Sequence, residues 1–245
     1  MALMPVQEAS LDFPRFGAAR TAIGKLLYWR YRLFQRRRHD TAVLERIGDF
    51  PLLVMPGVLN PRLMRSGEFF ASQLSAGLMA HGPDVLDMGT GSGVCAIAAA
   101  RHARRVVAVD ISAAAVRCAR INALLNHLEE RIEVTQGDLF APVQGRRFDI
   151  VLFNPPFIHG TPRSDADRAW RSTDVAERFA EGLQEHLAPG GFALVVLSTY
   201  GDAAGFIRHF RRCGFDMARL AVRRFINEQL ALVRLQPPRR SGGAQ

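Results

Sequence analysis

The sequence is poor in lysine, in cysteine and in long apolar runs. Lys25 is the only lysine among 32 basic residues, so the formal charge of +9 rests almost entirely on arginine. The three cysteines are widely spaced and odd in number, which argues against a disulfide framework and against a set of thiolate ligands for zinc. The seven histidines show no metal-binding spacing, and we therefore expect no metal site.

No stretch approaches the roughly 18–20 apolar residues that a membrane span requires, and the first residues lack the features of a secretory signal. We therefore expect a soluble protein of the cytoplasm. A length of 245 residues suits one α/β domain with an extension better than two full domains. The excess of arginine either attracts nucleic acid, ribosomes or anionic surfaces, or reflects only a genome whose base composition favours arginine.

Residues 21–40 mix apolar and aromatic side chains at near-helical spacing with a basic cluster at Arg36, Arg37 and Arg38. This pattern predicts a basic amphipathic helix. Three interpretations stay open: a helix docked on the core with its arginines in water, an arm that contacts RNA or the ribosome, and an organelle transit peptide. We assign residues 1–48 to this helical N-terminal extension, through which contact with nucleic acid is expected if the second interpretation holds.

From residue 83 onward, strand-like and helical segments alternate. The alternation predicts an α/β fold with a doubly wound, mostly parallel, Rossmann-like sheet of seven strands and helices on both faces. The last two strands have no helix between them and are expected to form an antiparallel pair. The expected strands are 85–88, 105–109, 132–135, 148–153, 192–198, 215–222 and 229–235, and the expected helices are 94–102, 112–126, 174–187 and 203–213.

Two further segments complete the expected domain, which spans residues 49–236. Prolines break residues 49–61 into extended pieces and turns, and a helix is expected over 66–81 with Ser66 as its cap. The tail over 237–245 is expected to be disordered.

Residues 87–93 read DMGTGSG, end the first strand of the sheet and open its first helix. Ligands of doubly wound sheets lie at the carboxyl ends of the strands, and glycines let the backbone approach them closely. The spacing departs from the dinucleotide fingerprint, because the third glycine comes one residue early and Val94 holds its place. An acid at Asp87 also suits a cationic ligand better than a pyrophosphate.

Acids also end the next two strands. Asp110 closes the second strand, where a carboxylate can accept two hydrogen bonds from a ribose diol; its alternative role is to cap the following helix, although Ser112 could fill that position. Residues 137–140 read GDLF and close the third strand. Three correctly ordered strand ends predict a nucleotide-like cofactor.

These strand ends resemble the motifs of class I S-adenosylmethionine-dependent methyltransferases. The resemblance implies S-adenosylmethionine as the cofactor, with the acid at position 138 near the adenine amino group and apolar neighbours flanking the ring. The residues assigned to cofactor binding are Asp87, Met88, Gly89, Thr90, Gly91, Gly93, Asp110, Ile111, Asp138, Leu139 and Asn154.

Residues 154–157 read Asn-Pro-Pro-Phe and directly follow an apolar strand. A double proline cannot continue a central strand and fixes a stiff turn. An amide or exocyclic-amine nitrogen is a poor nucleophile, because its lone pair is delocalised, so a catalyst must favour the geometry that turns this pair toward the methyl group. The Asn154 side-chain oxygen and the Pro155 carbonyl are candidates to accept the two N–H bonds, while Phe157 stacks on the planar group. The expected catalytic residues are Asn154, Pro155, Pro156 and Phe157.

The Asn-Pro-Pro-aromatic motif is similar to that of the HemK-like group, which spans glutamine N5-methyltransferases and N-methyltransferases acting on adenine or guanine amines. The segments 168–170 and 187–191 look more like the glutamine branch. In contrast, Phe157 stands where glutamine enzymes usually have tyrosine, and with His159 and Gly160 it resembles the ribosomal RNA guanine enzymes.

The resemblance implies N-methylation of a protein glutamine in the translation machinery, with a protein or RNA acceptor that is ribosome-associated. The first alternative is an exocyclic base amine in rRNA or tRNA. A non-catalytic RNA- or ribosome-binding adaptor and a small-molecule methyltransferase are further alternatives. The sequence leaves the oligomeric state open.

Overall fold

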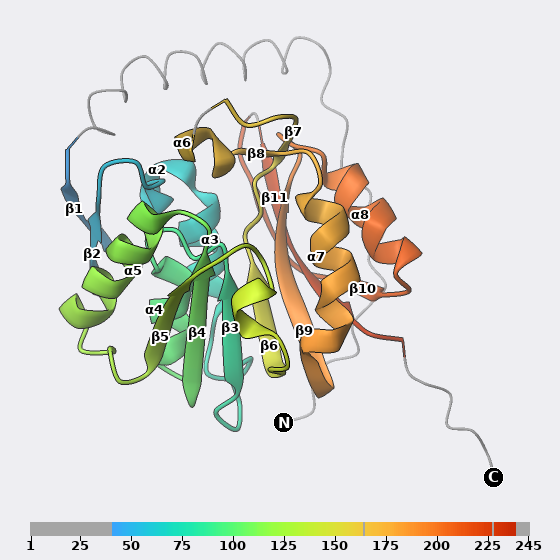
Figure 1. Ribbon diagram of the computed structural model, residues 1–245, viewed down its shortest axis with the longest axis horizontal. Helices are drawn as coiled ribbons and strands as arrows, with labels where there is room; N and C mark the ends of the chain where they lie inside the picture. Colours follow the sequence, from blue (N-terminus) through green and yellow to red (C-terminus); the bar gives the residue numbers. More distant parts are fainter. Residues whose placement is uncertain (1–40, 164, 227, 239–245) are drawn as a thin grey trace.

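The computed structural model describes residues 41–163, 165–226 and 228–238. Its centre is a seven-stranded sheet with the strand order β10-β11-β9-β6-β3-β4-β5 (Figure 1). The five strands from β9 to β5 in this order are parallel, β11 lies antiparallel to β9, and β10 pairs antiparallel with β11 at the edge. This confirms the expected mostly parallel sheet and its antiparallel C-terminal pair. The strands are β3 (Asp84–Met88), β4 (Arg105–Asp110), β5 (Ile132–Gln136), β6 (Phe148–Phe153), β9 (Leu187–Ser198), β10 (Asp216–Arg224) and β11 (Gln229–Gln236).

Helices cover both faces of the sheet, because the central strands carry apolar side chains on both sides. In β6, Ile150 and Leu152 join the core that includes α3 (Ser66–Gln73), α4 (Val94–Ala100) and α5 (Ala113–Leu125). The alternate residues Val151 and Phe153 join the opposite core. That second core includes residues of α7 (Val175–Leu183) and α8 (Ala203–Arg212), and a 3-10 turn over Gln184–His186 follows α7. The expected doubly wound fold is confirmed.

The helix expected over 66–81 begins at Ser66 in the structure, but it is shorter than expected and its cap is a different residue. α3 stops at Gln73, and a short helix, α2 (Pro61–Met64), precedes it directly. Arg65 joins the two helices with a φ of 58° and is the N-cap of α3, so the expectation that Ser66 caps this helix is wrong. Ser66 lies inside the first turn, where its side chain is buried and points to a distant partner instead of the helix end.

Two small strand pairs and a second short helix besides α2 were not expected from the sequence, although the strand over residues 50–54 falls in the segment 49–61 that was expected to hold extended pieces. β1 (Val43–Ile47) and β2 (Phe50–Val54) form an antiparallel hairpin, and β7 (Ile158–His159) runs parallel to β8 (Arg171–Ser172). The helix α6 (Asp165–Arg168) lies between β7 and β8.

The expected domain boundary between residues 48 and 49 falls in the turn of the β1–β2 hairpin, and Ile47 belongs to the core. The helix expected over 21–40 and the tail from 239 to 245 lie outside the described residues. The division of the chain into extension, domain and tail therefore stays a prediction. Within the described ranges, no helix is long and apolar enough to cross a membrane.

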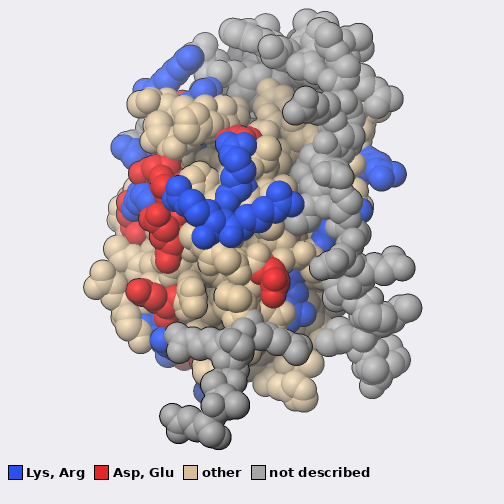
Figure 2. All heavy atoms as spheres, turned by 90° about the vertical axis from the view of Figure 1, so that its right-hand side faces the viewer, with Lys and Arg blue, Asp and Glu red and all other residues tan. Residues whose placement is uncertain are grey.

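Basic and acidic side chains lie next to one another on the side of the molecule that carries α8 (Figure 2). Arg208, Arg211 and Arg212 occupy exposed positions of α8. Arg212 forms ion pairs with Glu177 and Glu181 of α7, at N–O distances of 2.5 and 3.5 Å. The charge of this face is thus partly balanced within the molecule, and exposed pairs of this kind contribute little stability.

Candidate functional site

A cavity of about 260 Å³ lies at the carboxyl ends of the parallel strands, where a doubly wound sheet places its ligands. Strand ends from β3, β4, β5 and β6 form one part of its wall. Further parts of the wall come from the α2–α3 corner with the residues before it, from the start of α5, and from the segment that runs from Pro162 through β8 into α7. The sequence-predicted residues that line it are Met88, Gly89, Thr90, Gly91, Asp110, Ile111, Asp138, Leu139, Asn154 and Pro156, whereas Asp87, Gly93, Pro155 and Phe157 are not part of the wall.

The glycine-rich loop bends tightly beside the end of β4. The backbone N–H of Thr90 donates to the carbonyl of Val109 at 3.0 Å. Gly91 has a left-handed φ of 57°, and a Cβ added there would meet no atom within 4 Å, so the backbone is open toward the cavity. At Gly93, φ is 83° and a Cβ would lie 3.2 Å from the Cα of Ala119. Gly91 therefore faces the cavity, and the missing side chain at Gly93 allows the loop to pack on α5.

Asp87 lies beneath this loop. Its side chain is buried, and its Oδ2 accepts a hydrogen bond from the Thr90 hydroxyl at 2.7 Å. Burial raises the pKa of Asp87 to about 7, against the opposing effect of the hydrogen bonds from Thr90 and the Ala96 backbone. In this position the acid supports the loop from behind, and its direct contact with a cationic ligand stays a prediction.

Asp110 presents a carboxylate whose two oxygens are fixed by the backbone. Oδ2 accepts from the N–H of Gly91 at 2.8 Å, and Oδ1 accepts from the N–H of Ser112 at 2.9 Å. Burial raises its pKa, and these backbone donors oppose the shift. Ser112 is the N-cap of α5 and accepts from the N–H of Ala115. The alternative in which Asp110 itself caps this helix is therefore wrong, and its carboxylate lies on the cavity wall.

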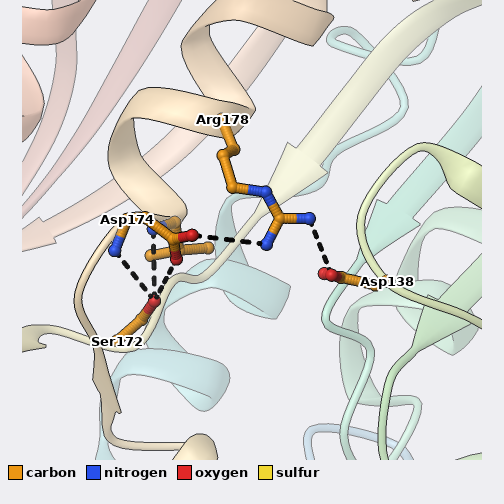
Figure 3. A network of polar contacts seen from close by, with 5 residues as sticks. Asp138, Ser172, Asp174 and Arg178 are labelled. Atoms are coloured by element: carbon orange, nitrogen blue, oxygen red, sulfur yellow. Dashed lines mark hydrogen bonds and ion pairs between the residues drawn. The ribbon is translucent and has the colours of Figure 1, made fainter. Parts of the chain in front are cut away.

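Asp138 is joined to the opposite rim of the cavity by an arginine that sequence reasoning missed (Figure 3). Arg178 reaches out from α7, and its Nη2 lies 2.6 Å from Asp138 Oδ2 and its Nη1 3.7 Å from Asp174 Oδ2. The Ser172 hydroxyl accepts from the backbone N–H groups of Asp174 and Val175, which fixes the start of α7. The spacing of Asp174 and Arg178 on one helix was a local signal, but the link to Asp138 is not visible in sequence.

Asn154 follows the last residue of β6 and carries an unusual side-chain amide. Its Nδ2 donates to the Ser66 hydroxyl at 3.2 Å. Its Oδ1 is buried and has no hydrogen-bond partner among the described residues. A buried acceptor without a donor costs about 1–3 kcal/mol. Because Asn154 lines the cavity, its oxygen is a candidate to accept an N–H or O–H group of a ligand.

The remaining residues of the Asn-Pro-Pro-Phe motif divide between the cavity and the protein interior. Pro156 lines the cavity, and Pro155 is buried beside it. Phe157 is half-buried against the core, and its carbonyl accepts from the N–H of Asp202 at 2.9 Å. The stacking role of Phe157 and the acceptor role of the Pro155 carbonyl stay predictions.

The α2–α3 corner is the other part of the site that sequence reasoning missed. Pro61, Met64 and Ser66 line the cavity from this corner. Asn60 caps α2 by accepting from the backbone N–H groups of Arg62 and Leu63 at 3.0 and 3.4 Å. An Asn-Pro pair is a local signal for a helix start, but nothing in the sequence places this helix beside residue 154.

Two arginines line the cavity next to β8. Arg168 and Arg171 line the cavity, and the Nε of Arg171 lies 3.3 Å from Asp167 Oδ2. Among the described residues, no group of three His, Cys, Asp or Glu side chains is arranged to hold a metal ion.

Comparison with known proteins identifies a family and several relatives. The family model for the methyltransferase small domain matches residues 55–214. The chain is 37% identical over 155 residues to the ribosomal RNA small subunit methyltransferase C of Alcanivorax borkumensis, which covers 63% of this chain and 44% of that protein. It is 30% identical over 191 residues to the release factor glutamine methyltransferase of Koribacter versatilis, covering 66% of this chain and 67% of that protein.

A solved structure shares the fold. The ribosomal protein L11 methylase of Lactobacillus delbrueckii subsp. bulgaricus superposes with a TM-score of 0.54 at 22% identity, covering 74% of this chain and 82% of that chain. This similarity supports the Rossmann-like fold described above. The match to the Alcanivorax protein spans less than half of that relative's length.

Proposed function

Because the chain belongs to the methyltransferase small domain family, we propose that it transfers a methyl group from S-adenosylmethionine to the side-chain amide of a glutamine, in a protein of the translation machinery. One observation carries the choice of a planar nitrogen as acceptor. Asn154 lines the cavity, and its Oδ1 is a buried acceptor with no partner among the described residues, which supports a role in accepting the N–H group of a substrate.

The residues on the wall fit S-adenosylmethionine. The space beside Gly91 is open, and the Asp110 carboxylate is held by two backbone N–H groups in a position suited to a ribose diol. Ile111 and Leu139 are the apolar wall residues that would flank the adenine, and the loop from Met88 to Gly91 would hold the amino-acid part. When bound, S-adenosylmethionine supplies an electrophilic methyl group on a sulfonium.

The chain's own contribution to the reaction is orientation. Asn154 Oδ1 would accept one N–H of the glutamine amide, which fixes the amide plane and increases the electron density on the nitrogen. Pro156, Phe153 and Met64 form apolar parts of the wall and would exclude water from the reacting atoms. Positioning of this kind accounts for a large share of the rate gain in a direct displacement.

The choice of glutamine is supported by the Koribacter relative, which is a release factor glutamine methyltransferase. The match to this chain covers 67% of that relative. A base amine in RNA is the second candidate function. It is supported by the Alcanivorax relative, a ribosomal RNA methyltransferase, and by Arg168 and Arg171 on the cavity rim, where guanidinium groups could contact phosphate.

The test uses methyl-labelled S-adenosylmethionine, the purified protein and an extract from cells that lack it. Protein, RNA and small molecules are separated before counting. Label in protein that resists nuclease supports glutamine methylation, and mass spectrometry then locates the residue. Nuclease-sensitive label would transfer the proposal to a base amine, label in small molecules would overturn both, and no label would favour a non-catalytic adaptor.

The variant that tests the role of Asn154 is Asn154→Ala. We expect turnover to be lost while the affinity for S-adenosylmethionine, measured by calorimetry, stays nearly unchanged. Asn126→Ala is the matched control, because Asn126 is not a wall residue of the cavity. If Asn154→Ala also abolishes cofactor binding, the role assigned to its oxygen is wrong.

A further inference from the structure

The Asn154 amide is tied to the protein at one end only. Its nitrogen end donates to Ser66 Oγ at 3.2 Å, and its oxygen end is the buried atom without a partner. The Ser66 side chain is itself buried and lines the same cavity. The hydroxyl therefore determines which way the oxygen end of the amide faces.

Ser66 is held in place by a tightly packed corner between α2 and α3. A Cβ added at the next residue, Gly67, would lie 2.7 Å from the Cβ of Pro61, so only glycine allows this approach. On the far side of the corner, Asn60 donates from Nδ2 to Glu45 of β1 at 2.9 Å. The corner thus has little freedom to move relative to the β1–β2 hairpin.

Arg65 forms the bend of this corner and has a strained backbone. Its φ of 58° and ψ of −33° are unfavourable for a residue with a side chain, and such strain is maintained only by the surrounding structure. The Arg65 guanidinium lies 4.5 Å from the centroid of the Phe225 ring, in the turn between β10 and β11. Glu228 of the same turn accepts from the Ser198 hydroxyl at 2.6 Å, which attaches the turn to β9.

We propose that Ser66 is a positioning residue that holds the Asn154 amide with its oxygen toward the acceptor, and that Arg65, anchored on Phe225, holds Ser66 in this place. The inference rests on the proposed function of Asn154. It adds to the site two residues outside the motifs that carry the family resemblance. One of them, Arg65, is not a wall residue of the cavity and acts only through its neighbour.

The first test is Ser66→Ala with Ser72→Ala as its control. Ser72 lies in the same helix, and its hydroxyl bonds the carbonyl of Phe69 at 2.7 Å, away from the cavity wall. We expect kcat to fall about 10- to 100-fold in Ser66→Ala. Cofactor affinity and thermal midpoint should stay close to the wild-type values, and Ser66→Thr, which keeps the hydroxyl, should recover most of the activity.

The second test compares Arg65→Ala with Arg223→Ala. Both guanidinium groups lie over the Phe225 ring, at 4.5 and 5.6 Å from its centroid, but only Arg65 is joined to Ser66 by the chain. We expect kcat to fall in Arg65→Ala and to stay unchanged in Arg223→Ala. Equal effects would overturn the role of Arg65.

The outcomes separate this inference from the proposed function. If Asn154→Ala is inactive and Ser66→Ala has wild-type kcat, the positioning role is wrong and the function of Asn154 stands. If Asn154→Ala keeps full activity, the proposed function fails first. A loss of cofactor affinity in Ser66→Ala would make Ser66 a structural residue of the cavity and would also overturn the inference.

Discussion

Replacing Asn122 by alanine should lower the free energy of unfolding by about 3–5 kcal/mol, because one buried amide satisfies three backbone groups. Asn122 lies on α5 and is fully buried. Its Oδ1 accepts from the N–H of Leu53 at 2.7 Å, and its Nδ2 donates to the carbonyls of Leu53 at 2.7 Å and of Ser92 at 2.8 Å. Each group left without a partner costs about 1–3 kcal/mol, and the total stays below three such costs because the Leu53 carbonyl keeps a weak donor, the Cys118 thiol at 3.2 Å.

The magnitude is large relative to the stability of a typical domain, about 5–15 kcal/mol. It should be measured by urea denaturation at equilibrium. Asn126→Ala is the control, since Asn126 bonds the carbonyls of Pro51 and Asn122 at 2.9 and 2.8 Å from a half-buried position that water can reach. We expect the control to lose less than about 1.5 kcal/mol.

A loss below about 1 kcal/mol in Asn122→Ala, or equal losses in both variants, would refute the reasoning. The small loss would mean that water satisfies the backbone groups that the Asn122 amide contacts. Equal losses would mean that the burial of the amide does not determine how much free energy of unfolding is lost. Because Ser92 belongs to the glycine-rich loop, Asn122→Ala should also weaken binding of S-adenosylmethionine, whereas the control should not.

Three further predictions concern the cofactor side of the cavity. Gly93→Ala should destabilise the protein more than Gly91→Ala in thermal unfolding, because both have left-handed φ values costing about 1–2 kcal/mol but only the new Cβ at 93 would approach Ala119, at 3.2 Å. The pKa of Asp87 is raised to about 7 from 3.8, so the native state binds a proton that the unfolded chain has lost, and stability should fall as pH rises from about 4 to 7. Asp87→Asn should lack this fall, and parallel unfolding curves for the two proteins at pH 5 and pH 8 would show that the carboxylate does not titrate. Asp110→Ala should weaken S-adenosylmethionine binding by about tenfold or more in calorimetry, and an unchanged affinity would count against the diol contact.

The sheet could be predicted from sequence because its signals are local. The central strands are buried on both faces, so residues 85–88 and 148–153 are apolar except for one aspartate each, and both strands appear in the structure close to the expected bounds. The wall residues Asp110, Asp138 and Asn154 were found for the same reason, since the carboxyl ends of parallel strands lie at one edge of the sheet.

What could not be predicted depends on contacts between distant residues. Ser66 has the local signature of a helix cap, and only the position of Asn154, 88 residues away, shows that its hydroxyl serves another group. Arg178 and Asp138 are 40 residues apart and meet across the cavity. Asp87 and Phe157 belong to the two motifs, but the fold leaves both of them outside the cavity wall.

The order of strands at the C-terminal edge has a consequence for synthesis of the chain. β11 lies between β9 and β10, although β10 precedes it in the sequence. During translation, β10 therefore has no partner strand until β11 has left the ribosome, and the turn that contacts Arg65 cannot close before then. We expect the nascent chain to complete the Ser66 corner only after nearly all described residues have emerged. A shorter nascent chain would contain the glycine-rich loop and Asn154, but the Ser66 corner that orients Asn154 would not yet be complete.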